Sequence, residues 1–463
     1  MAAAIDLGII GAGPAGLSAA LTAAELGLEV HLFDDGPSPG GRIFKALEAA
    51  PADRRWYPGD DHARGADLLN RFRASDVRYH PETTVWSVSR ERELGLAAGG
   101  RAWLLPARAV ILAGGAMERP WPFPGWTLPG VMTAGAAQVL LKTDGMVADG
   151  PALFAGAGPL LYLIAAQYLA AGATIAALLD LAPAGNARAA LGRLPGALRA
   201  PHYLRQGLAL RRRLRRAGVP LIRRVTDLEA RGGGQVETVS YRAAGRRTEV
   251  AARHLFVHMG LLPNSNLAAS LDLPHDWDQG RLCWRPRLDG WGASELPWLA
   301  IAGDGYDIAG AVAAERRGEL AGLWAAEGLG RIDVAERDRR AAPIHRRLNR
   351  ELAVRPFLDR LFRPPLEDLA KLDDAITVCR CEMVSAGDLR GALALGCGEV
   401  NQLKALTRAG MGRCQGRQCA GTVAQLIAAE TGRPVADVGG YRMRGPIKPI
   451  PLASLAALET GDD

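Results

Sequence analysis

The chain has 463 residues, of which 48% are hydrophobic and 23% are charged, and its formal net charge is +7. This length predicts two or three domains, and the composition is that of a globular protein without a disulfide scaffold. The basic residues concentrate in 211–218 and 221–225, where they predict a solvated helix face or a docking surface for an acidic partner. No aromatic-interleaved groove or nucleic-acid fold signature accompanies them, so we expect no nucleic-acid binding.

The first 34 residues carry a dinucleotide-binding pattern. The stretch IDLGIIGAGPAGLSAALTAAELGLEVHLFD predicts a strand, a glycine turn, a helix and a second strand. Gly11 permits the turn, Gly13 lets the backbone approach a pyrophosphate, and Gly16 lets the helix pack closely on the strand. The helix N-terminus faces the phosphates. Asp34, at the end of the second strand, is placed to accept hydrogen bonds from an adenosine ribose.

Further stretches favour FAD as the dinucleotide. Gly41 and Arg42, in PSPGGRI, can bring backbone and a guanidinium to the pyrophosphate. The order of the stretches resembles that of two-dinucleotide-binding flavoproteins. This resemblance implies that Asp304 holds the ribityl chain and that the backbone of Val85 meets the adenine. The predicted FAD contacts are Gly11, Gly13, Pro14, Ala15, Gly16, Asp34, Gly41, Arg42, Val85, the crossover residues Ala113 and Gly114, and Gly303 and Asp304.

Residues 151–179 are uncharged and rich in alanine and glycine. They predict a strand, a turn and a buried helix rather than a membrane span. The N-terminus lacks the basic region of a signal peptide and a twin-arginine pattern, so we expect a cytoplasmic protein with no integral membrane segment.

The same region repeats the N-terminal pattern at an offset of 145 residues, which predicts a second nucleotide fold. It departs from the pattern at two places: Leu161 replaces the third glycine, and Asp180 lies one residue beyond the position that matches Asp34. Leu161 is expected to push the helix away from its strand, and the acid repels a 2′-phosphate. An occluded or purely structural site is therefore favoured over NAD(H) binding.

Cys283 is the one cysteine among the first 377 residues. Disulfide reductases of this two-domain plan need a redox-active cysteine pair beside the flavin, so their chemistry is excluded. We expect Cys283 to be a buried small hydrophobe.

The remaining cysteines cluster near the C-terminus, and Cys379, Cys381, Cys414 and Cys419 form a CxC…CxxxxC pattern. Four thiolates suit zinc or an iron–sulfur cluster, and structural zinc usually employs CxxC knuckles. The glycines of GMGRCQGRQC offer backbone N–H groups to cluster sulfides, and nearby arginines offset the charge. A [2Fe–2S] cluster is favoured, while zinc and reactive thiols stay open as alternatives. Cys397 is expected to pack rather than to act as a fifth ligand.

The whole chain resembles a known family. The motifs that carry the resemblance are GAGPAGLSAA, GGRI, AMERPWPFPGWTLPGVMTAGAAQ, GAGPLL, GLLPN, GDG, the four cysteines and the tail GPIKPIPLASLAAL. They resemble the larger flavoprotein subunit of opine oxidases, hydroxyproline dehydrogenases, hydrogen cyanide synthases and related heteromeric amine dehydrogenases. The cysteine segment resembles the bacterioferritin-associated-ferredoxin-type [2Fe–2S] domain.

The resemblance implies a partner and a division of labour. A smaller, FAD-containing, amine-oxidase-like subunit would oxidise the C–N bond of an opine, hydroxyproline or related amino or imino acid, with room for a flavin at the interface. This chain would supply FAD and the [2Fe–2S] cluster as an electron path. The alternative is a self-sufficient NAD(P)H:acceptor oxidoreductase that feeds electrons to its own cluster.

The expected fold class is α/β: a Rossmann-like FAD domain with an inserted NAD(P)-like domain, followed by a small helical [2Fe–2S] domain. No catalytic residue is assigned. His258 is expected to be structural, and Glu118 and Arg119 are expected to pair with each other or with the chain. The expected ranges are 1–115 and 265–345 for the FAD domain, 116–264 for the insert, 346–371 for a linker, 372–440 for the cluster domain and 441–463 for a tail.

Overall fold

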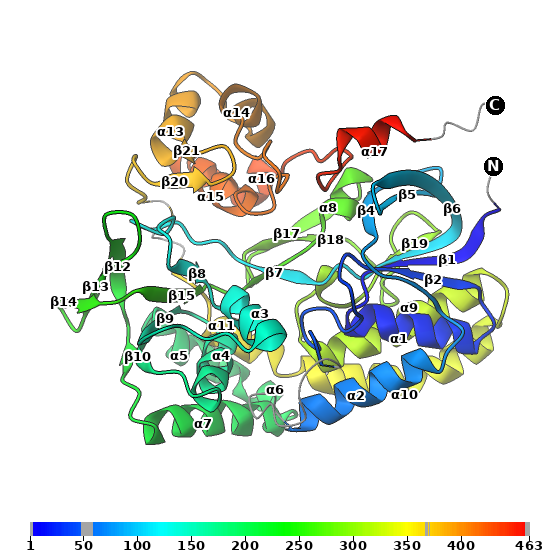
Figure 1. Ribbon diagram of the computed structural model, residues 1–463, viewed down its shortest axis with the longest axis horizontal. Coiled ribbons are helices and arrows are strands. Elements are labelled where there is room, and N and C mark those ends of the chain that lie inside the picture. Colours follow the sequence, from blue (N-terminus) through cyan, green and yellow to red (C-terminus); the bar gives the residue numbers. More distant parts are fainter. Residues whose placement is uncertain (1–2, 48–58, 366–368, 370, 459–463) are drawn as a thin grey trace.

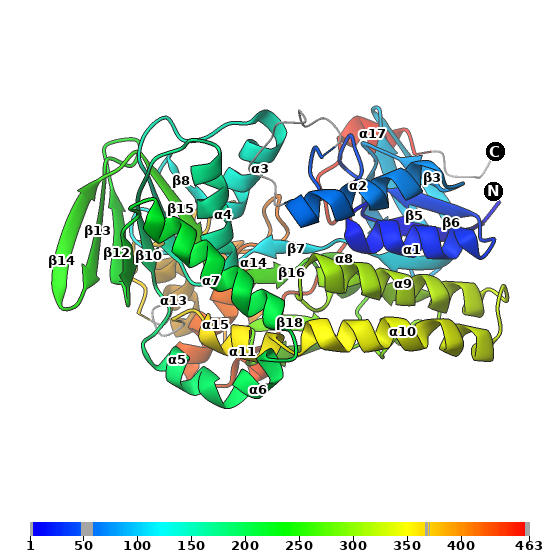
Figure 2. The same ribbon diagram turned by 90° about the horizontal axis from the view of Figure 1, so that it is seen from below.

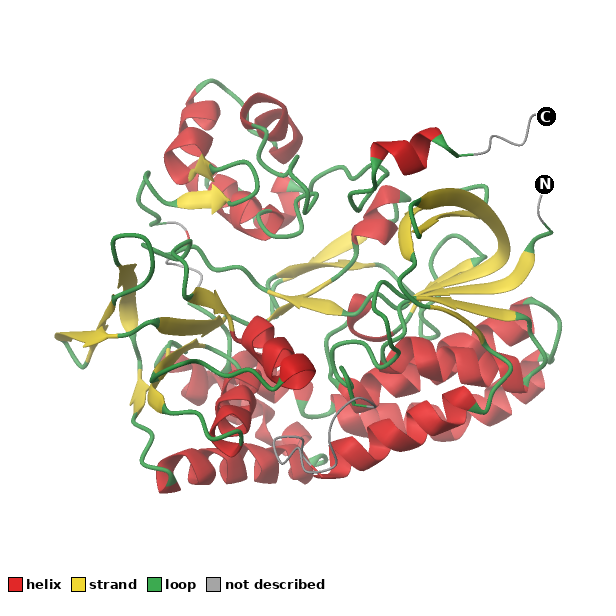
Figure 3. Ribbon diagram, in the orientation of Figure 1, coloured by secondary structure: helices red, strands yellow, loops and turns green. Residues whose placement is uncertain are grey.

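The computed structural model describes residues 3–47, 59–365, 369 and 371–458, so the expected ranges 1–115, 346–371 and 441–463 lie partly outside the described residues. Two α/β domains lie side by side, and a small helical domain sits above the left one in the view of Figures 1 and 3. This arrangement confirms the α/β fold class with two nucleotide-type folds and a C-terminal helical domain.

The first domain is built on a seven-stranded sheet of the described strands, in the order β3-β2-β1-β6-β5-β4 with β19 also paired to β6. The C-terminal half of β6 pairs in parallel with β1 and β19, and its N-terminal half pairs antiparallel with β5. The strands are β1 (Ile5–Ile10), β2 (Val30–Phe33), β3 (Arg78–His80), β4 (Thr84–Val88), β5 (Glu93–Ala98), β6 (Arg101–Leu112) and β19 (Leu299–Ile301).

Helices cover one face of this sheet, as Figure 2 shows from below. They are α1 (Pro14–Glu25), α2 (Gly59–Arg73), α9 (Ala311–Gly328) and α10 (Val334–Leu352), and the turn η2 (Gly303–Gly305) precedes α9. The central strand β1 is a nearly continuous apolar run because parallel strands are buried on both faces.

The second domain contains a five-stranded parallel sheet of the described strands, in the order β11-β10-β9-β15-β8. Residues 151–179 form β9, a turn, α4 and most of β10, which confirms the strand–turn–helix prediction for this uncharged stretch. The elements are β8 (Val131–Thr133), α3 (Ala134–Asp144), β9 (Ala152–Gly156), α4 (Pro159–Ala170), β10 (Ile175–Asp180), α5 (Gly185–Ala190), η1 (Leu191–Arg193), α6 (Leu194–Ala197), α7 (Pro201–Arg216), β11 (Leu221–Arg223), the sheet β12 (Thr226–Arg231), β13 (Thr238–Ala243) and β14 (Arg246–Ala251), and β15 (His254–His258).

Two antiparallel strands, β7 (Ala116–Glu118) and β16 (Leu261–Pro263), join the first two domains. The chain leaves the first domain through β7 and returns through β16. After β16 come α8 (Asn266–Ser270) and the hairpin of β17 (His275–Asp278) and β18 (Cys283–Pro286).

The small domain follows α11 (Arg355–Leu361), a helix that packs against α5 of the second domain. Among the described residues, a short hairpin and four helices build it, and the tail then packs on the first domain, where the backbone N–H of Ile447 donates to Trp86 O at 2.8 Å. The elements are β20 (Thr377–Cys379), β21 (Val384–Ser385), α13 (Ala386–Ala394), α14 (Val400–Thr407), α15 (Ala420–Thr431), α16 (Val435–Val438) and, in the tail, α17 (Leu452–Ala456).

A search of the described helices for a segment with the length and hydropathy needed to cross a bilayer returns none.

Close packing of α1 on α9 depends on glycine. A Cβ at Gly318 would lie 2.1 Å from Ala15 O, and a Cβ at Gly322 would lie 2.8 Å from Ala19 O. Both distances are too short for a carbon–oxygen contact, so an added methyl group would force the helices apart. The helix that carries the glycine turn at its N-terminus is therefore fixed by contacts that only glycine permits.

We expect Gly318→Ala to lower the free energy of unfolding by about 2 kcal/mol, because overpacking at a close helix crossing strains both backbones. Gly328→Ala is the matched control, since a Cβ at the exposed end of the same helix meets nothing within 4 Å. Urea denaturation measures both variants. Equal stability of the two variants would contradict this account of the packing.

Candidate cofactor sites

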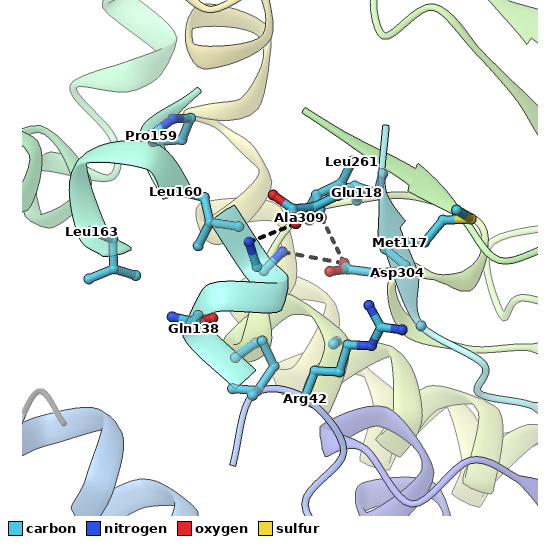
Figure 4. A pocket seen from close by; sticks show the side chains of 18 of the residues that line it. Arg42, Met117, Glu118, Gln138, Pro159, Leu160, Leu163, Leu261, Asp304 and Ala309 are labelled. Atoms are coloured by element: carbon cyan, nitrogen blue, oxygen red, sulfur yellow. Dashed lines mark hydrogen bonds between the residues drawn. The ribbon is translucent and has the colours of Figure 1, made fainter. Parts of the chain in front are cut away.

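A cavity of about 2290 Å³ opens between the first two domains. In Figure 4 the side chains of Arg42 and Asp304 both point into it. The predicted FAD contacts that line it are Gly11, Gly13, Pro14, Ala15, Asp34, Gly41, Arg42, Val85, Ala113, Gly114 and Asp304.

Gly16 and Gly303 lie behind the cavity wall rather than in it. A Cβ at Gly16 would lie 1.8 Å from Gly11 O, and a Cβ at Gly303 would lie 2.6 Å from Ala15 Cβ. These two glycines therefore serve the packing of the loop and not direct contact with a ligand.

Gly13 is different, because its missing side chain leaves space within the cavity. Its backbone is extended (φ −77°, ψ −179°), a conformation that any residue adopts. A Cβ there would meet only Gly41 Cα, at 4.0 Å. The protein itself thus tolerates a side chain at this position, and the empty volume beside the N-terminus of α1 fits a pyrophosphate.

The Asp34 carboxylate at the end of β2 is held by two backbone groups. Ala12 N–H donates to Oδ2 at 2.6 Å, and Gly36 N–H donates to Oδ1 at 2.8 Å. Each oxygen keeps a further lone pair for a ribose hydroxyl. The buried Val85 lines the same end of the cavity.

At the other end, Asp304 fixes the start of α9. Its Oδ1 accepts hydrogen bonds from the N–H groups of Ala309 and Gly310, at 2.9 and 3.3 Å. The first residues of α9, Ala311 and Val312, line the cavity, so the positive end of the helix dipole faces it.

Several cavity residues have no role predicted from the sequence. Asn264 donates from Nδ2 to Gly114 O at 3.3 Å, and Lys142 of α3 donates from Nζ to Ile43 O at 2.9 Å. Asn264 belongs to the GLLPN motif, which was a usable signal, whereas Lys142 lies in an ordinary helix. Gln418 and Lys448 also line the cavity although they come from the small domain and the tail, and no local pattern marks them.

In the second nucleotide fold, the chain's own residues engage the acid that ends β10. Tyr162 donates its hydroxyl to Asp180 Oδ2 at 2.8 Å, and Ala182 N–H donates to Oδ1 at 3.0 Å. Burial, followed by the charge of Asp180, raises the pKa of Tyr162, so the phenol stays a donor. The ring of Tyr162 also lies 6.3 Å from that of Phe362, between ring centroids. A side-chain hydroxyl thus holds one carboxylate oxygen of Asp180, whereas backbone N–H groups hold both oxygens of Asp34. Tyr162 and Asp180 both line the large cavity.

A buried polar pair joins the two domains where β7 and β15 end. His258 Nδ1 lies 2.7 Å from Glu118 Oε1, and Gly135 N–H donates to Glu118 Oε2 at 2.7 Å. Glu118 therefore pairs with His258, 140 residues away, rather than with Arg119. The His258 ring also lies so close to Gly158 that a Cβ there would be 2.6 Å from it. The glycine turn of the second fold is therefore packed against the His258 ring.

The four clustered cysteines meet in the small domain as two interacting pairs. Donation from the Cys419 thiol, together with backbone N–H groups of Gly410 and Glu382, lowers the pKa of Cys379 to about 6, although burial opposes this. Burial, and then the neighbouring Cys381, raise the pKa of Cys414. Cys379 and Cys419 are buried, whereas Cys381 and Cys414 are half-buried.

The structure also limits what these cysteines can hold. Within the described part of the chain, no three His, Cys, Asp or Glu side chains gather as a site for a single metal ion. Backbone N–H groups of Gly416 and Gln418 point at Cys414 and would offset the charge of bound thiolates.

The other two cysteines, Cys283 and Cys397, are not part of this group, and both have packing roles. Cys283 is buried, and burial raises the pKa of its thiol to about 11, which makes it inert near neutral pH. Cys397 is half-buried and packs against the apolar core of the small domain.

The loop 408–419, which carries Cys414 and Cys419 and is called the cysteine loop below, contacts the wall of the large cavity. Gln418, next to Cys419, lines that cavity. Gln415, next to Cys414, accepts a hydrogen bond at its carbonyl from Asn266 Nδ2 at 3.0 Å. Two residues before Asn266, the Asn264 side chain is bonded to Gly114. One short segment, 264–266, therefore contacts both sites.

Comparison with known proteins agrees with this architecture. Residues 5–318 match the family described as pyridine nucleotide-disulphide oxidoreductase, and residues 377–459 match the sarcosine oxidase A3 domain. L-proline dehydrogenase from P. horikoshii shares the fold at a TM-score of 0.70 and 19% identity, covering 98% of this chain and 79% of that one.

Sequence relatives extend over nearly the whole chain. The A subunit of the opine oxidase of Rhizobium meliloti is 39% identical and covers 98% of this chain and 87% of that protein. The HcnB subunit of the hydrogen cyanide synthase of Pseudomonas aeruginosa is 33% identical, with 98% of each chain covered. The alpha subunit of the sarcosine oxidase of Rhizobium meliloti is 28% identical, and the match covers 98% of this chain but 43% of that protein. The chain thus belongs to the FAD-dependent pyridine nucleotide-disulphide oxidoreductase family and, within it, to the group that holds the larger flavoprotein subunits of the opine oxidases.

Proposed function

We propose that this chain is the electron-transferring subunit of a heteromeric dehydrogenase. A smaller flavin-containing partner would oxidise the C–N bond of an opine, hydroxyproline or related amino or imino acid. The observation that carries the proposal is the contact between the cysteine loop and the cavity wall through Gln418 and Asn266. A relay needs two electron-carrying groups at close range, and this contact supports the proposal because it brings the two candidate sites of the chain together.

The residues that we propose for FAD are the predicted set, with Asn264 added at the crossover. Asp34 would accept the ribose hydroxyls, the loop at Gly13 would cradle the pyrophosphate, and the N-terminus of α9 would face the flavin pyrimidine. Gly16 and Gly303 would act only by packing. When both are bound, the flavin accepts an electron pair and a [2Fe–2S] cluster passes single electrons.

For the cluster we propose Cys379, Cys381, Cys414 and Cys419 as ligands. The paired sulfurs, the backbone N–H groups that point at them and the arginines at 380, 413 and 417 support two irons with two sulfides. The clustering of five of the six cysteines between residues 379 and 419 also supports a cytoplasmic location, because it suggests a metal site in a reducing compartment rather than structural bridges.

The alternative, a self-sufficient NAD(P)H oxidoreductase, is less well supported. It needs productive nucleotide binding at the second fold, and there a ribose hydroxyl would have to compete with the Tyr162 hydroxyl for Asp180 Oδ2. The His258 ring lies against the Gly158 turn as well.

We expect Gly13→Val to fold normally and to bind FAD about 100-fold more weakly, a loss of about 2.8 kcal/mol, because the side chain fills the space of the pyrophosphate. The ratio of flavin absorbance to protein, followed by FAD titration, measures this effect. Gly150→Val is the control, since a Cβ there meets nothing within 4 Å. A fully yellow Gly13→Val protein would refute the site.

Iron and acid-labile sulfide are expected at about two of each per chain. Cys381→Ser should remove both and leave FAD bound, because the cluster ligands lie in a separate domain. Cys397→Ser is the control and should keep full iron and sulfide. Stoichiometric zinc without sulfide would show that the cysteines hold a different metal.

Catalysis is expected to require the partner subunit. The isolated chain should reduce an artificial dye neither with an amine substrate nor with NADH, whereas the complex with the product of a neighbouring gene should turn over the amine at roughly ten per second. Opines, proline, hydroxyproline and sarcosine are the substrates to test. Fast turnover of NADH by the lone chain would favour the alternative function.

A further inference from the structure

Tyr441 is held in place beside the cysteine loop by two glycines. Gly410 and Gly416 both have positive φ, of 90° and 74°, and a Cβ at either would lie 2.6 Å from the Tyr441 ring. Gly416 stands between the ligand positions 414 and 419. The ring is therefore wedged against the loop that carries two of the proposed ligands, and larger residues at these glycines would expel it.

The hydroxyl of this ring is buried beside the Cys419 thiol. Tyr441 is 6% exposed, and its buried oxygen forms no hydrogen bond of standard geometry with the described residues. Buried hydroxyls are nearly always paired, and the side-chain contact with Cys419 gives this one a sulfur to which it can donate. A phenol is protonated near neutral pH, so the hydroxyl is available as a donor.

The surroundings of the hydroxyl are sulfur atoms and a cation. Cys419 is the side chain that interacts with it most strongly, and Cys379 and Cys414 follow. Lys404 lies over the ring, with Nζ 5.5 Å from its centroid, and its amine donates to Arg442 O at 3.3 Å. A thiol is a weak acceptor, but a thiolate that ligates iron is a strong one.

We propose that Tyr441 donates a hydrogen bond to the Cys419 sulfur of the loaded protein and thereby raises the reduction potential of the iron–sulfur group. This inference rests on the proposed function. Reduction adds one electron to the group, and the hydroxyl keeps its proton, so the added negative charge strengthens the bond. The reduced state gains more from the donor than the oxidised state does, which makes the group easier to reduce.

The test is the potential of the group in wild-type and Tyr441→Phe proteins, measured by redox titration followed by electron paramagnetic resonance. Phe keeps the wedge and removes only the donor. We expect the equilibrium constant for reduction to fall at least tenfold, equivalent to about 59 mV for one electron. Tyr168→Phe is the control, because it loses a buried hydrogen bond to Ala137 O in the second domain and should leave the potential unchanged.

A second variant covers the case in which Tyr441→Phe fails to assemble the group. Placing 3-fluorotyrosine at position 441 gives a more acidic phenol of nearly the same shape, which should raise the potential. Unchanged potentials in a loaded variant of either kind would overturn the role of Tyr441. Wild-type protein without iron and sulfide would instead overturn the proposed function, so the two failures are distinguishable.

Discussion

The relative position of the two nucleotide folds depends on one buried guanidinium. Arg119, directly after β7, is 6% exposed and donates to three backbone carbonyls: Met259 O at 3.1 Å, Leu282 O at 2.8 Å and Arg281 O at 2.8 Å. The carbonyls come from the end of β15 and from the β17–β18 hairpin. Burial lowers the pKa of the guanidinium, and the three carbonyl acceptors that meet its five N–H donors offset part of the lost hydration. The crossover strand, the returning strand and the hairpin are thereby held to one another.

The Glu118–His258 pair extends the same junction into the second fold. Glu118 binds both His258 and the first turn of α3, so it ties the end of β7 to the second fold. Its neighbour Arg119 ties the same point to the end of β15 and to the β17–β18 hairpin. Because the buried polar groups of this junction are hydrogen-bonded, a rotation of one domain relative to the other would leave them without partners, and the junction resists it. Rigid placement suits an electron path, in which distance matters more than motion.

Local residue patterns predicted the parts of the molecule that repeat in many proteins. The turn at Gly11 and Gly13, the acid at Asp34 and the spacing of the four cysteines all act within a few tens of residues, and their elements form as expected. Contacts such as Glu118 with His258 or Asn266 with Gln415 join residues 140 or more apart. No periodicity connects such positions, and neither polar type nor local context singles them out. The position of Tyr441 beside the cysteines is unpredictable for the same reason, since it depends on the residues that the fold places around its hydroxyl.

The second nucleotide fold has a use that does not require a nucleotide. Its sheet and the small domain share one hydrophobic core, in which Leu153 and Leu179 of the sheet belong to the same cluster as Cys379 and Val423. Trp126, just before β8, donates from Nε1 to Thr377 O at 2.8 Å and ties the entry of the cysteine hairpin to this domain. The hydrogen bond between Tyr162 and Asp180 leaves this structural role of the fold intact. The fold acts as the platform that presents the cysteine loop to the cavity, and this role explains why its core is complete although its acid is engaged.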